Sequence, residues 1–237
     1  MKCRYNNVVM SKIDSFLKLA NIFENHKHHL CLVGGTVRDY VSAVPLTDMD
    51  AVTDATPEEM KSILDPFKAD YTFARMGSVK VIFDDVKFDI VTLRKESNYD
   101  DYRHPKTIKF IKSKRRDSLR RDFTLNAMYL DNTLNVLDYH HGRRDLEKNI
   151  LRMVGNPNKR IKEDPLRIIR AIRFSLTYGY HFDKKLEKAI YKNVELVNKL
   201  NEDKIKEEIR KMNGVDENKI IQTFATFNIK CPLKVVK

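Results

Sequence analysis

Two aspartates separated by one residue, Asp48 and Asp50, are side chains whose spacing could support chemistry. They fall within Thr47–Thr53, where alternation predicts a strand, and residues i and i+2 of a strand project from the same face. Two carboxylates held on a rigid strand suit one or two Mg²⁺ ions, which can promote an in-line phosphoryl displacement. The same short pattern is also common on protein surfaces, so its sequence context has to decide.

The context adds two features. Gly34 and Gly35 follow residues 29–33, a predicted buried strand, and precede a short predicted helix. Glycines at such a place let backbone amides approach a triphosphate, although a plain tight turn has the same sequence. Asp89 adds a third carboxylate in another predicted strand, where its apolar neighbours make an unpaired aspartate costly unless it meets a cation or water.

Periodicity and turn signals predict the elements that position these residues. Val79–Phe83 and Phe88–Leu93 are predicted strands, joined as a hairpin through Asp84 and Asp85. The other predicted elements are helices at 11–28 and 37–44, a helix opened by a capping box at Thr56–Glu59, a strand at 71–74, and helices at 118–130, 165–178, 184–199 and 201–212. Residues 94–106 lack periodicity and are predicted to form a mobile loop. The chain is thus α+β up to about residue 139 and all-α beyond it.

Composition narrows the possible partners. The chain has 237 residues, 42% hydrophobic and 33% charged, with a net charge of +12 and a pI of about 9.5. This surplus favours a polyanion such as RNA. No stretch approaches the roughly 20 apolar residues of a membrane span, and the three cysteines lack zinc-ligand spacing. We expect a cytoplasmic protein without a membrane partner.

Several motifs, in order, resemble the signature of the class II tRNA nucleotidyltransferases (CCA-adding enzymes) and bacterial poly(A) polymerases. The matching segments are 32–39, 48–50, 52–59, 89–94, 94–105, 120–128 and 163–174. The resemblance implies a polymerase-β-type nucleotidyltransferase head at 1–139, with a mixed sheet and flanking helices. It further implies a helical neck at 140–212 that selects the nucleobase, followed by a short remnant at 213–237.

The resemblance also implies a catalytic mechanism. Asp48 and Asp50 would hold two Mg²⁺ ions, and Asp89 would complete the site. The RNA 3′-hydroxyl would attack the α-phosphorus of a nucleoside triphosphate, and pyrophosphate would leave. The residues near the triphosphate would be Gly34, Gly35 and Arg38. For Arg38, a salt bridge with a nearby acid is an equal alternative.

Ribose binding is implied for Arg121 and Asp122, because an aspartate can accept a hydrogen bond from a 2′-hydroxyl. The adjacent Arg120 is equally interpreted as a solvated surface cation.

Base selection is implied for the helix that begins at residue 163. An aspartate can accept from the amino group of cytosine or adenine, and an arginine can donate to a ring acceptor of the same base. The candidates are Glu163, Asp164 and Arg167, with Arg170 of the same motif as a further nucleotide-binding residue. The structural alternative makes Asp164 a helix N-cap and Arg167 an ordinary helix cation.

The segment 94–106 matches the flexible loop of the family. Its matching residues are Arg94, Glu96, Tyr99, Asp101 and Arg103. The retained loop implies addition of the terminal A, and the strand start at Gly77 is more similar to the CCA-adding type than to the poly(A) polymerases. The expected activity is therefore CCA addition to tRNA from CTP and ATP.

Alternatives remain at this point. A poly(A) polymerase, an A-only or CC-only transferase, or an inactive RNA-binding remnant would share many of these features. Family members usually continue well beyond the neck, whereas about 25 residues follow Met212 here. The chain could thus be a minimal enzyme, a fragment, or one half of a pair whose second chain supplies the body and tail.

Overall fold

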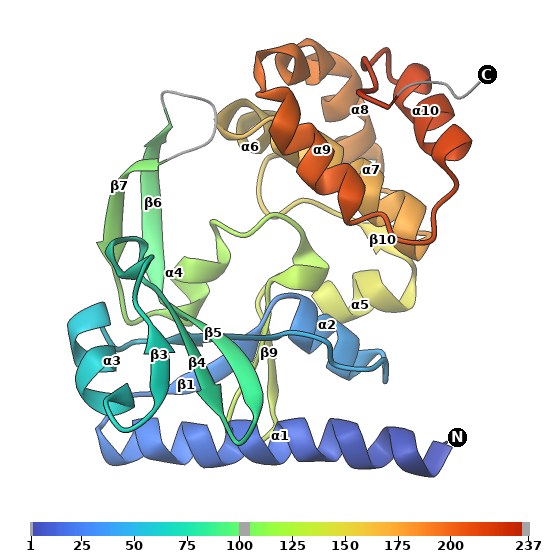
Figure 1. Cartoon of the computed structure of the whole chain (residues 1–237). Coiled ribbons are helices and arrows are strands. Elements are labelled where there is room, and N and C mark those ends of the chain that lie inside the picture. Colours follow the sequence, from blue (N-terminus) through green and yellow to red (C-terminus); the bar gives the residue numbers. More distant parts are fainter. Residues whose placement is uncertain (1, 100–104, 234–237) are drawn as a thin grey trace. The chain divides into compact units, whose positions relative to one another are not determined.

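The computed structural model describes residues 2–99 and 105–233 (Figure 1). The chain forms two compact units. The head unit contains the described residues of 1–96, 107–121 and 125–143, and the neck unit contains those of 97–106, 122–124 and 144–237. The elements with residues in both units are β6 (Arg94–Tyr99), β7 (Pro105–Phe110), η2 (Thr124–Asn126) and α5 (Gly142–Glu147).

A seven-stranded sheet forms the centre of the head unit. Its strands, in spatial order, are β3 (Lys68–Asp70), β4 (Ser78–Phe83), β5 (Val86–Thr92), β2 (Met49–Thr53), β1 (Leu30–Val33), β8 (Met128–Leu130) and β9 (Val136–Asp138). Strands β2 and β5 run parallel, and the other neighbouring pairs run antiparallel. The predicted α+β fold with a mixed sheet is therefore confirmed.

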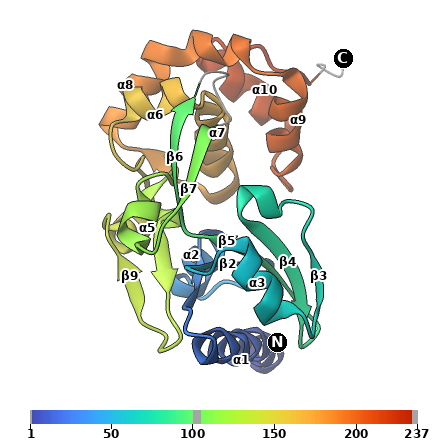
Figure 2. The ribbon, with the colours of Figure 1, turned by 90° about the vertical axis from the view of Figure 1, so that its left-hand side faces the viewer.

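Helices and short turns flank this sheet. They are α1 (Lys2–Asn25), α2 (Gly35–Val41), α3 (Pro57–Leu64), the 3₁₀ turn η1 (Ala74–Met76) and α4 (Lys114–Ser118). Helix α1 lies along one side of the sheet (Figures 1 and 2) and buries Phe16, Leu19 and Phe23. The helix was predicted at 11–28, but it begins well before residue 11.

Two local predictions in the head unit are confirmed in detail. Asp84 and Asp85 form the tight turn between β4 and β5, both with positive φ, at 48° and 59°. Aspartate tolerates this left-handed region better than most residues. At the start of α3, Thr56 and Glu59 form the predicted capping box.

The neck unit is mostly helical. Its elements are β10 (Ile150–Leu151), α6 (Pro157–Glu163), α7 (Leu166–Tyr178), β11 (His181–Phe182), α8 (Lys184–Asn193), η3 (Val194–Lys199), α9 (Glu202–Arg210) and α10 (Glu217–Thr226). Helix α7 packs Phe174 edge-on against Phe123, and it ends at Gly179 in the left-handed conformation, as predicted. The parallel pair β10–β11 is an exception to the predicted all-α character.

The predicted helix at 118–130 is wrong. The chain there forms the end of α4, the 3₁₀ turn η2 and strand β8. The backbone N–H of Phe123 is bound by the side chain of Asp122, and the N–H of Thr124 donates to the carbonyl of Arg152. These bonds replace the i to i−4 bonds that a helix would need.

Two further segments differ from their predictions. The predicted strand at 71–74 is instead a turn, because the Asp70 carboxylate accepts from both the N–H and the hydroxyl of Thr72 and so ends β3 early. The predicted loop at 94–106 contains the residues of β6 and the start of β7, which pair as a two-stranded ribbon (Figure 2). This ribbon is mostly polar, so hydrophobic periodicity could not reveal it.

Gly77 offers a test of this packing. Its φ is +83°, and an added Cβ would lie 2.8 Å from Cε1 of Phe110. Gly77→Ala should lower the free energy of unfolding by about 2–4 kcal/mol, because it combines a disfavoured φ with a steric clash. Gly155, at φ +78° with nothing within 4 Å, is the matched control. Gly155→Ala should lower it by only about 1–2 kcal/mol in urea denaturation. Equal losses would contradict the clash.

Candidate active site

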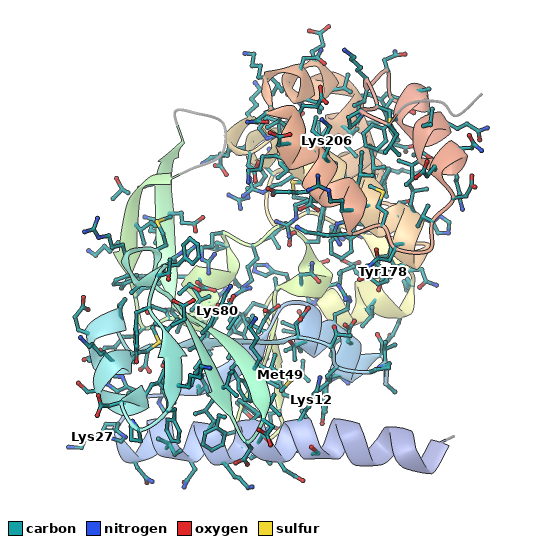
Figure 3. All side chains as sticks on the ribbon, viewed as in Figure 1. Lys12, Lys27, Met49, Lys80, Tyr178 and Lys206 are labelled. Carbon is teal, nitrogen blue, oxygen red and sulfur yellow. The ribbon has the colours of Figure 1, made fainter. Side chains whose placement is uncertain are left out.

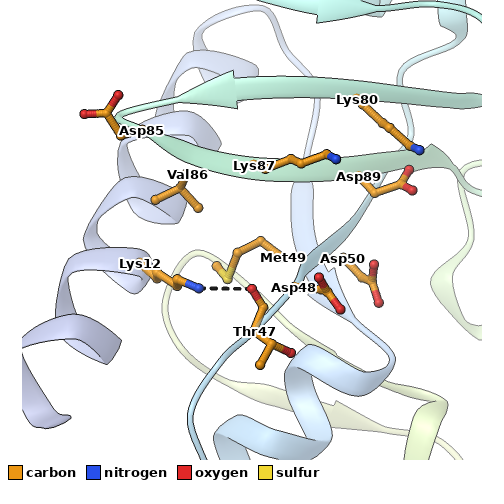
Figure 4. Close-up of a pocket in the computed structure, with 10 residues that line it drawn as sticks. All are labelled: Lys12, Thr47, Asp48, Met49, Asp50, Lys80, Asp85, Val86, Lys87 and Asp89. Carbon is orange, nitrogen blue, oxygen red and sulfur yellow. Dashed lines mark hydrogen bonds between the residues drawn. The ribbon is translucent and has the colours of Figure 1, made fainter. Parts of the chain in front are cut away.

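Three carboxylates gather at β2 and β5 of the head unit. Asp50 and Asp89 occupy paired positions on these two parallel strands, and Asp48 directly precedes β2. Their carboxylates lie on the same side of the strands in Figure 4. The Thr36 hydroxyl donates to the carbonyl of Asp48 and accepts from the N–H of Asp50, both at 2.9 Å. Thr36 of α2 thereby fixes the backbone that carries the first two carboxylates.

Two hollows in the head unit open onto this cluster. We call the first the carboxylate hollow; its volume is about 530 Å³ (Figure 4), and its lining residues are Lys12, Thr47, Asp48, Met49, Asp50, Lys80, Asp85, Val86, Lys87 and Asp89. We call the second the arginine hollow; its volume is about 410 Å³, and its lining includes Gly34, Phe73, Met76, Ser78, Arg94, Arg120 and Arg121. Both contain Asp50, Asp89 and Lys80. Either hollow has the volume of a small-molecule site.

The protein compensates the carboxylates only in part, because burial and the neighbouring acids raise the pKa of Asp50 more strongly than Arg121 and Arg38 lower it. Among the described residues, the side chains of Asp48 and Asp50 have no hydrogen-bond or ion-pair partner, whereas Asp89 accepts from the Ser78 hydroxyl at 2.8 Å. Burial, and then the nearby charges of Asp89 and Asp48, raise the pKa of Asp50 to about 6. A bound cation would relieve this repulsion.

The carboxylates of Asp50 and Asp89 suit a Mg²⁺ ion whose other ligands are phosphates and water. Across residues 2–99 and 105–233, no three His, Cys, Asp or Glu side chains gather closely enough to hold a metal ion on their own. Mg²⁺ is commonly held by one or two carboxylates together with substrate phosphates and water, rather than by a complete protein cage. Asp50 and Asp89 provide such a pair beside a hollow that can take phosphates.

Gly34 and Gly35 lie where they were predicted, between β1 and α2. Gly34 has φ +69°, which requires glycine, and an added Cβ would lie 3.7 Å from a carboxylate oxygen of Asp50. The backbone at Gly34 is therefore open toward the carboxylates. Gly35 faces the guanidinium of Arg38 instead.

Arg38 has the structural contact that was the alternative to phosphate binding. Its guanidinium is buried, pairs with the Asp39 carboxylate at 2.7 Å, and donates to Asn126 at 3.3 Å. It lines neither hollow.

A fully buried carboxylate, Asp117, orders the arginines of the second hollow. It accepts from the Arg94 backbone N–H at 3.0 Å, from Nε of Arg120 at 2.8 Å and from the Tyr129 hydroxyl at 2.8 Å. Arg121 pairs with it at 3.1 Å and lies over the Tyr129 ring. Burial opposes its ionisation, yet the guanidinium groups of Arg121 and Arg120 lower the pKa of Asp117. It therefore stays ionised and balances part of their charge.

Residues of the predicted flexible loop join the same network. Glu96 pairs with Arg94 at 2.8 Å and with Arg120 at 3.4 Å. Arg120 is thus a bound, largely buried cation, and its interpretation as a solvated surface residue is wrong. The backbone of Tyr99 belongs to β6. Asp101 and Arg103 lie outside the described residues.

In the neck unit, Asp122 and Arg170 lie together. One carboxylate oxygen of Asp122 accepts from the N–H of Phe123 at 2.8 Å, and the other is 2.5 Å from Arg170 Nη2. The second contact is an ion pair without hydrogen-bond geometry, so this buried oxygen lacks a hydrogen-bond donor among the described residues. Although burial opposes it, Arg170 and the N–H of Phe123 lower the pKa of Asp122.

The base-selection candidates also lie in the neck unit, at the junction of α6 and α7. Glu163 pairs with Arg160 and lies 3.7 Å from Arg167, whose guanidinium donates to the carbonyl of Arg160. Asp164 accepts from the N–H of Leu166 at 3.1 Å, but the predicted N-cap is wrong by one residue, because α7 begins at Leu166 and Pro165 occupies the N-cap position. Arg167 is buried rather than an ordinary solvated helix cation.

Three residues of the site were missed from the sequence. Lys80 and Asp89 are paired across the β4–β5 hairpin. The predicted two-residue turn fixes that register, so counting back from it would have placed Lys80 opposite Asp89. Ser78 could have been found in the same way, two pairs further along. For Asp117, Arg120 and Arg121 at i+3 and i+4 were a local signal. Its contacts with Arg94 and Tyr129, 23 and 12 residues away, could not be found from the sequence.

The head unit matches a known protein family. The sequence model described as the poly A polymerase head domain matches residues 30–152. The chain belongs to this family. The match covers β1, β2 and β5 with all three carboxylates, and it ends within the first elements of the neck unit.

The curated relatives of this chain include the CCA-adding enzymes of two bacteria, Staphylococcus saprophyticus and Lactobacillus helveticus. That of Staphylococcus saprophyticus is 35% identical over 191 residues, which are 81% of this chain and 47% of the relative. That of Lactobacillus helveticus is 40% identical over 180 residues, 76% of this chain and 45% of the relative. The chain thus spans about half the length of these relatives.

Solved structures share the fold. The Bacillus stearothermophilus CCA-adding enzyme in complex with CTP has a TM-score of 0.79 and 28% identity, covering 90% of this chain and 51% of that protein. The Thermotoga maritima CCA-adding enzyme complexed with tRNA has a TM-score of 0.73 at 22% identity, which supports the fold alone. In the described part of the chain, no helix is long and apolar enough to span a membrane.

The Asp117 network yields a stability prediction. Asp117→Asn should lower the free energy of unfolding at pH 7 by about 3–5 kcal/mol, because buried guanidinium groups lose their counter-charge. The exposed pair of Lys18 and Asp84 provides the control. Asp84→Asn should stay within about 1 kcal/mol of the wild type in urea denaturation. Comparable effects of the two substitutions would contradict the role given to Asp117.

The raised pKa of Asp50 yields a pH prediction. A carboxyl whose pKa rises from 3.8 to about 6 on folding favours the folded state below pH 3.8 and loses that contribution as the pH passes 6. Asp50→Asn should therefore gain about 1–2 kcal/mol relative to the wild type on going from pH 4 to pH 8, without metal. The measurement is urea denaturation at both pH values. A pH-independent difference between the two proteins would contradict the raised pKa.

Proposed function

We propose that this chain is the head and neck portion of a cytoplasmic RNA nucleotidyltransferase that adds CCA, from CTP and ATP, to the 3′ end of tRNA. One observation carries the proposal: Asp50 and Asp89 are paired on parallel strands beside a hollow lined by Gly34 and three arginines. Phosphoryl transfer needs carboxylates and cations together, because the former hold a metal and the latter bind phosphate. The relatives named CCA-adding enzymes support the choice of product.

In this proposal, the head unit binds the triphosphate. Arg94, Arg120 and Arg121 neutralise its charge, and the open backbone at Gly34 lets it approach Asp50. The RNA 3′-oxygen forms a bond to the α-phosphorus while the bond to the β-phosphate oxygen breaks and pyrophosphate leaves. Two Mg²⁺ ions, held by Asp48, Asp50 and Asp89, would activate the hydroxyl and stabilise the leaving oxygen. Ser78 keeps the Asp89 carboxylate oriented for this role.

The neck unit then recognises the sugar and the base. The buried Asp122 oxygen that lacks a hydrogen-bond donor would accept from a ribose 2′-hydroxyl in the bound state, and Arg170 keeps that carboxylate ionised. Asp164 would accept from the amino group that C and A share, and Arg167 would donate to the adjacent ring acceptor. Glu163 and Arg160 hold Arg167 in a fixed orientation. Asp164 and Arg167 would together reject G and U, because these bases present different hydrogen-bonding groups.

A second candidate comes from the family itself, whose description is a poly A polymerase head. A poly(A) polymerase, or an enzyme that adds only A or only CC, would use the same carboxylates. The chain also spans about half of its relatives, so a second chain could supply the regions that grip tRNA. Product sequence distinguishes these possibilities.

The deciding experiment incubates the purified chain with Mg²⁺, CTP, ATP and a tRNA transcript that ends before CCA, and then sequences the 3′ ends. We expect C, C and A to be added in order. Asp50→Asn/Asp89→Asn should reduce the rate at least about 1000-fold, because the metal site is lost. Lys68→Ala, an exposed lysine on β3, is the control and should act as the wild type.

Each other outcome has a defined meaning. Only A, only CC, or a long A tract would replace the CCA proposal with the second candidate. No addition despite measurable RNA binding would contradict activity of this chain alone. The proposed function as a nucleotidyltransferase would then survive only if a second chain restored addition.

A further inference from the structure

The strand order places different chemistry on the two sides of the carboxylates. Across the sheet, β1, β2, β5 and β4 follow one another. Gly34 directly follows β1, Asp50 and Asp89 lie on the two central strands, and Lys80 lies on β4. The carboxylates therefore have the open glycine backbone on one flank and β4, with the turn η1, on the other. Figure 3 marks Lys80 and Met49 on these strands of the head unit.

The β4 flank has an exposed aromatic ring beside a cation. Phe73 is 56% exposed, and it lines the arginine hollow next to Met76. The amine of Lys80 lies 6.0 Å from the centre of the Phe73 ring. Bases stack on such rings regardless of their sequence, and an adjacent lysine can meet a backbone phosphate.

The backbone that carries this ring is fixed. The N–H of Ser78 and that of Met76 both donate to the carbonyl of Phe73, at 3.2 and 2.9 Å. The carbonyl of Met76 accepts from the Arg94 guanidinium. An exposed ring on such a tight turn is presented to solvent without loss of order, which suits a ligand platform.

We propose that Phe73 and Lys80 bind the 3′-terminal nucleotide of the accepting RNA, the base on the Phe73 ring and its phosphodiester against Lys80. This assignment rests on the proposed function and says which side of the carboxylates takes the RNA. Lys80 is paired with Asp89, so a nucleotide held there has its 3′-hydroxyl beside that carboxylate. The phosphates of the incoming nucleotide lie toward Gly34, which lines the same arginine hollow as Phe73.

Two physical differences separate the two ligands. A triphosphate carries several charges and suits the three arginines of the arginine hollow, whereas one phosphodiester carries one charge and suits one lysine. The accepting base also changes with every nucleotide added. A platform that selects by stacking alone accepts any base, because every base has a π-face.

The test measures RNA binding directly, without nucleotide or catalysis. An RNA hairpin whose 3′-terminal base is 2-aminopurine is titrated with the full chain, and the fluorescence quenching caused by stacking is followed. Phe73→Ala should weaken binding about 5- to 100-fold and abolish the quenching, and Phe73→Tyr should restore both. Ile82→Ala, which removes an exposed apolar side chain from β4 outside both hollows, is the matched control.

Lys80 is tested through salt dependence. Lys80→Ala should lower the slope of log affinity against log salt by about one, and Lys80→Arg should keep it. The exposed Lys68 on the neighbouring strand is again the control, and Lys68→Ala should leave the slope unchanged. In nucleotide addition, Phe73→Ala should raise KM for RNA and leave KM for CTP within about twofold.

Specific results would overturn the assignment. Absent quenching with the wild type, unchanged quenching in Phe73→Ala, or a rise confined to KM for CTP would each do so. The wild-type addition assay separates this failure from failure of the proposed function. If the wild type adds nucleotides but Phe73→Ala does not alter RNA binding, only the role of Phe73 in RNA binding is rejected. If Phe73-dependent quenching is seen but no nucleotide is added, the role of Phe73 is kept and the proposed nucleotidyltransferase activity is rejected.

Discussion

The candidate site of the head unit depends on the repulsion between the carboxylates of Asp48, Asp50 and Asp89, which the fold holds close together. Parallel pairing of β2 and β5 forces Asp50 and Asp89 to adjacent positions, and the charges of Arg121 and Arg38 offset only part of the burial and repulsion at Asp50. Such a site is unfavourable in the isolated fold and becomes favourable when a cation and phosphates arrive. The rigid backbone from Thr36 through β2 is needed to hold the two charges together.

The complementary problem, three clustered arginines, is solved by burying one acid. Asp117 touches Arg120, Arg121 and the backbone of Arg94, while Glu96 bridges Arg94 and Arg120 from another side. The arginines therefore stay charged and are held in fixed conformations. Phosphate binding then costs less side-chain conformational entropy, because these side chains are already ordered. Partly compensated acids and paired arginines thus line one hollow, which is the charge arrangement that the proposed metal–triphosphate ligand requires.

The neck unit also holds charged side chains in ion pairs. Asp122 with Arg170, and Glu163 with Arg160 and Arg167, are buried or half-buried ion pairs whose orientation is fixed by neighbouring groups. Fixed polar groups discriminate between ligands because a mismatched partner leaves a buried group unsatisfied. This is the property that a protein surface needs in order to select bases without a nucleic-acid template.

The sequence alone determined the carboxylates, the α+β head, the hairpin at Asp84 and Asp85, the capping box of α3 and the glycine that ends α7, because strand alternation, turn residues and capping are local properties. Only the tertiary structure decided that Arg38 pairs with Asp39 and Asn126, that Arg120 is bound rather than solvated, and that 118–130 is not a helix. In each of these cases a side chain or backbone group is satisfied by a partner distant in the sequence. Local periodicity carries no information about such a partner, because it exists only once the chain has folded.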